Sequence, residues 1–114
     1  MAADIFIKNQ FIEVPWQVFS ELYDIFYCIS KRDGFAIQHP NVSKMLDFMN
    51  VINSNPCNGC FDLSDFLVNN DDVETVIYML QDAINQLQHK FSFYVISELE
   101  KLNQYLLVYS NDLK

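Results

Sequence analysis

The chain has 114 residues, of which 51% are apolar, and its fifteen aspartates and glutamates against seven lysines and arginines give a formal net charge of −8. This length and apolar content predict one folded domain, residues 1–114, and exclude a disordered chain. The negative charge disfavours non-specific binding to nucleic acid or to an anionic membrane, and it favours a cationic partner.

The N-terminal part of the chain predicts a short irregular segment followed by a helix. Residues 5–14 fit a short strand, a hairpin or an arm packed on the helices. Pro15 suits the first turn of a helix, and the helix is expected to stop at Asp33 and Gly34. Between these points apolar residues recur at helical spacing: Trp16, Phe19, Leu22, Tyr23, Ile25, Phe26 and Ile29.

The remainder of the chain predicts three more helices. The second begins at Pro40 and ends in the breaker run of residues 53–56. The third begins with Asp71 as N-cap and Glu74 three residues later, which resembles a capping box, and the last follows Ser92. One helical turn is expected between Ser64 and Val68. Together these segments predict an all-α fold, either a four-helix bundle or an irregular helical arrangement.

The start of the chain and its apolar runs bear on its location. The first residues lack a basic segment followed by a long apolar stretch, so they do not resemble a secretory signal. No apolar run approaches the roughly 20 residues that a membrane-spanning helix needs. We therefore expect a cytoplasmic protein that does not contact a membrane.

The acidic residues are unevenly distributed along the sequence. No lysine or arginine lies between Lys44 and Lys90, and five acids fall between Asp62 and Glu74. This segment is interpreted as a docking face for a basic protein, because opposite potentials steer association. The alternative is a solvated acidic surface that keeps the protein soluble. The predicted partner-binding residues are Asp62, Asp65, Asp71, Asp72, Glu74, Tyr78 and Asp82.

Residues that could support catalysis or metal binding are few. Cys57 and Cys60 have C-x-x-C spacing, but a structural zinc site needs four ligands, so two reduced cysteines are the favoured interpretation. Cys28 is expected in the core. His39 and His89 lack a partner at fixed spacing, and motifs for a nucleophile elbow or a phosphate loop are absent. The sequence therefore predicts a protein that is not an enzyme and that needs no cofactor or metal.

In overall profile the chain resembles the small immunity proteins that bacteria make against their own toxins, of the nuclease colicin and contact-dependent growth inhibition types. This resemblance is carried by an acidic group and the tyrosine that follows it: Asp62, Asp65, Asp71, Asp72, Glu74 and Tyr78. In such families acids and tyrosines on helices cap a basic toxin surface, often a nucleic-acid-binding cleft. The resemblance thus implies an immunity protein that neutralises a basic toxin domain, most naturally a nuclease.

Three other functions are compatible with the same sequence. One is an acidic mimic of nucleic acid that inhibits a DNA-binding protein. Another is a helical adaptor or subunit whose aromatic-rich face completes an oligomer. The last is a small metal or thiol regulator that uses Cys57 and Cys60.

Overall fold

The protein combines five α-helices with a small β-sheet in the described part of the chain. The computed structural model describes residues 2–55 and 60–114. The strands are β1 (Ala2–Ile7), β2 (Gln10–Pro15) and β3 (Cys60–Asp62), and a 3-10 turn spans Leu63–Asp65. The helices are α1 (Trp16–Asp33), α2 (Phe35–Gln38), α3 (Pro40–Ser54), α4 (Asn70–Leu87) and α5 (Phe93–Leu113).

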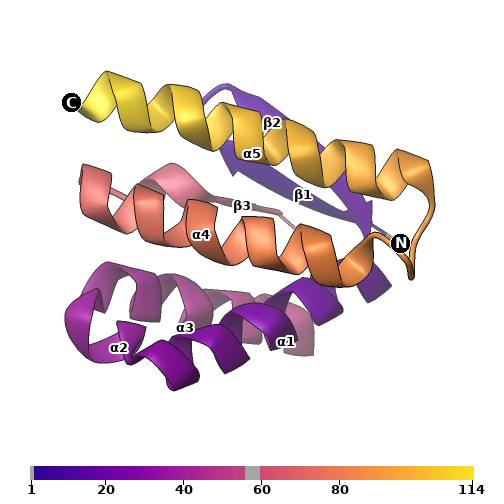
Figure 1. The fold of residues 1–114 in the computed structure, drawn as a ribbon, viewed down its shortest axis with the longest axis horizontal. Coiled ribbons are helices and arrows are strands. Elements are labelled where there is room, and N and C mark those ends of the chain that lie inside the picture. The colour runs from indigo at the N-terminus through magenta and orange to yellow at the C-terminus, as the bar shows by residue number, and fades with distance from the viewer. Residues whose placement is uncertain (1, 56–59) are drawn as a thin grey trace.

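The sheet overturns the expected all-α fold, so neither a four-helix bundle nor an irregular helical arrangement describes the molecule. β1 and β2 form an antiparallel hairpin, and β3 pairs in parallel with β1, giving the order β2-β1-β3. Figure 1 shows the strands behind α4 and α5. In β1 and β2 buried residues alternate with more exposed ones, as expected for strands that place one face on a core.

One face of the hairpin is apolar and faces the helices. Ile5 on β1 and Ile12 on β2 are each 1% exposed, and they lie directly opposite one another. α1 and α5 both contact this hairpin. The two strands are joined by Lys8 and Asn9, and Lys8 has a φ of 56°, a left-handed conformation that usually favours glycine. The opposite face of the hairpin carries Asp4, Phe6, Phe11 and Glu13.

The predicted ends of α1 and α3 are confirmed. Gly34 adopts a φ of 72° and donates its backbone N–H to the carbonyl of Ser30, which ends α1 in a left-handed cap. Pro40 occupies the first turn of α3, where its missing N–H costs no helical hydrogen bond. The short helix α2 fills the corner between these two helices and was not predicted from the sequence.

The helices α4 and α5 form the second half of the molecule and pack against each other (Figure 1). Ser92 caps α5 by accepting from the backbone N–H of Val95, as expected for a helix that follows it. The N-cap of α4 is Asn69, whose side chain accepts from the backbone N–H of Asp72 at 2.9 Å. The prediction of Asp71 as N-cap was wrong, because α4 begins earlier and places Asp71 inside its first turn. Among the described residues, no helix is long and apolar enough to cross a membrane.

Candidate functional site

The residues predicted to bind a partner are divided by the fold into buried, capping and exposed groups. Asp72 is buried, and Asp62 is used as a cap for the 3-10 turn. Asp65, Asp71, Glu74 and Tyr78 are exposed, and Asp82 is half-buried on α4. The acidic segment of the sequence is therefore not one continuous surface in space.

Asp72 belongs to a polar network that joins the start of α3 to the start of α4. It is only 3% exposed. Its carboxylate accepts a hydrogen bond from Asn41 Nδ2 at 2.9 Å and lies 3.4 Å from His39 Nδ1. The other ring nitrogen of His39 is 3.2 Å from Thr75 Oγ1 on α4. Because Asp72 faces inward and is already bonded, it is not available to a partner protein.

Asp62 holds two chain segments together at the end of β3. Its Oδ1 accepts from the backbone N–H of Ser64 at 2.8 Å and from the Ser64 hydroxyl at 2.6 Å. The same oxygen is 3.3 Å from the backbone N–H of Lys8, at the tip of the hairpin. This carboxylate therefore stabilises the turn that leads toward α4 and fixes the hairpin tip against it.

The exposed acids of α4 line an open groove against the α1–α2 corner, which we call the α4 groove. It has a volume of about 400 Å³. Asp71 and Glu74 contribute carboxylates from the first turns of α4, and Tyr78, 48% exposed, follows one turn later. The ring of Phe35 meets that of Tyr78 edge to face at 6.1 Å. The groove is lined by Asp33, Phe35, His39, Asp71, Glu74, Thr75 and Tyr78.

Two cations from distant parts of the chain approach this groove, although the sequence around α4 contains no lysine or arginine. The Arg32 guanidinium donates to both carboxylate oxygens of Asp33 at 3.1 Å and to the Tyr78 hydroxyl at 3.2 Å. The hydrogen bonds from Arg32 hold the pKa of Asp33 below its usual value, and the same pairing raises the pKa of Arg32. Lys114 Nζ lies 4.0 Å from Glu74 Oε1. The absence of lysine and arginine between residues 45 and 89 is thus partly offset in three dimensions.

Five contributors to this groove were missed in the sequence: Thr75, Arg32, Asp33, Phe35 and His39. Thr75 lies on α4 itself, and the other four come from the end of α1, from α2 and from the residue before α3. Helical periodicity places such residues on their own helices, but it does not show which helix each one meets.

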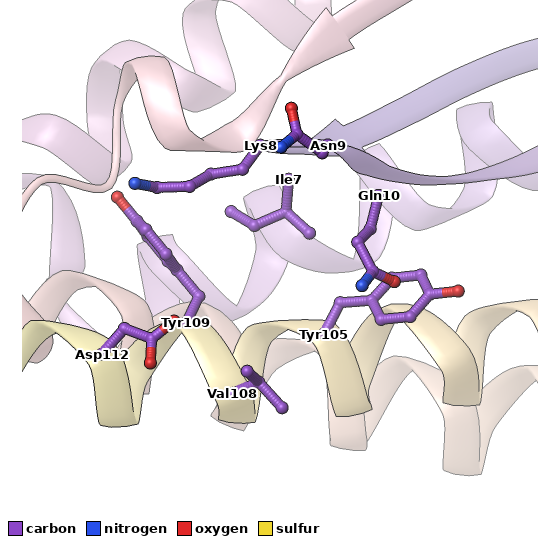
Figure 2. Close-up of a pocket in the computed structure, with 8 residues that line it drawn as sticks. All are labelled: Ile7, Lys8, Asn9, Gln10, Tyr105, Val108, Tyr109 and Asp112. Carbon is purple, nitrogen blue, oxygen red and sulfur yellow. The ribbon is translucent and has the colours of Figure 1, made fainter.

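A second concavity lies beneath the hairpin tip and is drawn in Figure 2. It has a volume of about 230 Å³. Lys8 extends over the ring of Tyr109, with Nζ 5.5 Å from its centroid. The Tyr109 hydroxyl donates to the carbonyl of Leu67 at 2.7 Å, and burial is the main cause of its raised pKa. The lining residues are Ile7, Lys8, Asn9, Gln10, Tyr105, Val108, Tyr109 and Asp112.

The cysteines and the possible metal ligands are separated in the described structure. In residues 2–55 and 60–114, no group of three or more His, Cys, Asp or Glu side chains could hold a metal ion. Cys60 is exposed on β3, and Cys28 is exposed on α1 rather than in the core, where it was expected. Cys57 lies outside the described residues, so the C-x-x-C pair as a whole is not described.

No protein-family model, curated protein or solved structure matches the chain. The chemistry of the α4 groove is therefore the main basis for assigning a function.

Proposed function

We propose that this protein binds a basic protein domain through the α4 groove and thereby neutralises it, as an immunity protein neutralises a toxin. The observation that carries the proposal is the grouping of three carboxylates, from Asp33, Asp71 and Glu74, around the rings of Phe35 and Tyr78. We infer that the partner is a toxin from the resemblance of the sequence profile to immunity proteins. The binding mode comes from the residues of the groove.

The groove combines two properties that protein interfaces use. Its acids create a negative potential that steers a basic partner and raises the association rate constant. Its aromatic rings offer large apolar area with few rotatable bonds, and such residues dominate binding energy in many interfaces. A nuclease has to be basic to hold phosphates, so an acidic protein is suited to cover that surface.

The groove is also partly ordered before any partner binds. Arg32 bridges Asp33 and the hydroxyl of Tyr78, which restricts the side chains of both. Restricting side chains in advance lowers the entropy lost on association. The arrangement therefore favours the binding of a protein surface.

The test compares two double variants that change the net charge equally. Asp71→Asn with Glu74→Gln removes two carboxylates from the α4 groove. Asp24→Asn with Glu100→Gln removes two exposed carboxylates that do not line it. The binding partner in the experiment is the purified product of the reading frame adjacent to that of this protein. Association and dissociation rates are measured by biolayer interferometry at low and at high salt.

We expect the groove variant to lower the association rate constant by about three- to tenfold at low salt, and the effect to shrink at high salt. The control variant should change this constant by less than about twofold. Failure of the adjacent gene product to bind at all would contradict the immunity assignment. Equal loss in both variants would show that net charge, not the groove, drives association.

A further inference from the structure

The outer face of the sheet carries an arrangement that the α4 groove does not explain. Ala3, Ile5 and Ile7 of β1 are buried, so the alternate residues Asp4 and Phe6 lie on the opposite face. The register places Asp4 opposite Glu13 and Phe6 opposite Phe11. We call these four residues, Asp4, Phe6, Phe11 and Glu13, the outer sheet face.

The two acids of this face form a like-charge pair. Residues directly opposite on antiparallel strands have Cβ atoms about 4.5–5.5 Å apart, and like charges in such positions destabilise a sheet. Within the described residues, neither Asp4 nor Glu13 has an ion-pair partner. Asp4 Oδ1 is shut off from solvent, so a cation that arrives from outside can reach this carboxylate only through its other oxygen. The free protein therefore holds a negative charge pair that a cation would relieve.

The aromatic half of the face is stacked and accessible. The rings of Phe6 and Phe11 are 5.1 Å apart between centroids, with an interplanar angle of 25°. Phe11 is 50% exposed. Because cross-strand diagonal neighbours lie about 7–8 Å apart, a long side chain can reach the Phe11 ring and the Asp4 carboxylate at once.

These features match one kind of side chain. A guanidinium stacks on an aromatic ring and donates in parallel to carboxylate oxygens, whereas an ammonium acts as a point charge. A second copy of this chain is a poor occupant, because its net charge of −8 would add to the repulsion. The one basic residue of the hairpin, Lys8, extends over Tyr109 on the helical side (Figure 2).

We propose that the outer sheet face is a second contact surface, which takes an arginine side chain of a basic protein partner. The guanidinium lies over the ring of Phe11 and donates to Asp4 Oδ2 and to the carboxylate of Glu13. This proposal does not depend on the α4 groove, because the two surfaces share no residue.

The experiment titrates the full chain, labelled with nitrogen-15, with a hexa-arginine peptide and separately with a hexa-lysine peptide. Amide shifts report which surface each peptide contacts. We expect the arginine peptide to perturb residues 4, 6, 11 and 13, and to bind there about threefold more tightly than the lysine peptide. Asp4→Asn with Glu13→Gln should weaken binding at this face about fivefold or more.

Two further measurements separate the proposal from simple charge attraction and from misfolding. Asp71→Asn with Glu74→Gln should leave the shifts at the outer sheet face unchanged. The sheet variant should melt no lower than the parent, because it removes a like-charge pair. Shifts confined to the α4 groove, equal binding of both peptides at the sheet, or full binding by the sheet variant would each overturn the proposal.

Discussion

The α4 groove and the outer sheet face both present acids, but the fold treats those acids differently. In the groove, Asp33 is paired with Arg32, and Glu74 lies near Lys114. On the sheet, Asp4 and Glu13 face each other, and among the residues that the structure describes neither has such a cation. A partner that binds the groove thus competes with existing ion pairs, whereas a cation that binds the sheet relieves the repulsion between two carboxylates. The number of acids in a segment therefore does not indicate how available they are.

The largest expected effect comes from the one acid of the α4 segment that is buried. Asp72→Ala removes the acceptor for Asn41 Nδ2 and leaves His39 without its carboxylate neighbour. It is costly to lose a hydrogen bond to a charged group and to leave a buried polar group without its partner. The free energy of unfolding should therefore fall by about 2–3 kcal/mol. Asp71→Ala, one residue earlier and exposed, should cost about 0.5 kcal/mol or less. Urea denaturation of both variants measures the difference, and equal losses would contradict the division of these acids.

The next prediction concerns Tyr109, which joins the hairpin tip to the segment before α4. Tyr109→Phe leaves the carbonyl of Leu67 without the hydroxyl donor and should lower the free energy of unfolding by about 1–2 kcal/mol at neutral pH. Burial raises the pKa of this tyrosine above its ordinary value of 10.0. Its contribution to stability is therefore complete below pH 10 and is lost as pH rises through the folded-state pKa.

The pH dependence provides the control for that variant. Denaturation of parent and Tyr109→Phe is compared at neutral pH and at rising alkaline pH. The stability difference between them should shrink as the tyrosine ionises in the unfolded chain. Tyr23, whose pKa is raised mainly by burial, titrates in both proteins and cancels in the comparison. A difference that stays constant with pH would contradict the role given to the Tyr109 hydroxyl.

A smaller effect is expected from Arg32, the cation at the α4 groove. Arg32→Gln removes the donors that lower the pKa of Asp33, so this pKa should rise toward its usual value. The depressed pKa contributes stability above the unfolded-state value, and this is lost as pH falls through the folded-state pKa. Since the pair is exposed to solvent, the free energy of unfolding should change little at neutral pH. Carboxyl NMR titration measures the pKa, and an unchanged value would show that the pair does not persist in solution.

The helices were largely predictable from sequence, whereas the sheet and the groove were not. Apolar spacing and local stop signals, such as Gly34 after α1 and Pro40 before α3, act within a few residues and can be read directly. The strand β3 has three residues and pairs with β1, more than fifty positions earlier, so no local pattern reveals it. Asp72 likewise has its partners 31 and 33 residues away. The burial of Asp72 depends on which other helix packs against α4. The spacing of apolar residues along α4 does not reveal that.

The smallest expected effect tests the unpaired acids of the sheet. Glu13→Gln removes one charge of the pair with Asp4 and keeps the side-chain shape. Because like charges directly opposite are destabilising, the variant should be more stable by about 0.2–0.5 kcal/mol at low salt, and this gain should shrink as salt screens the pair. Glu100→Gln, an exposed acid on α5, serves as the control and should be neutral. Thermal melts at two salt concentrations measure the difference. A destabilised Glu13→Gln, or an equal gain in Glu100→Gln, would show that Asp4 and Glu13 do not repel each other, which would remove the electrostatic reason for an arginine to bind there.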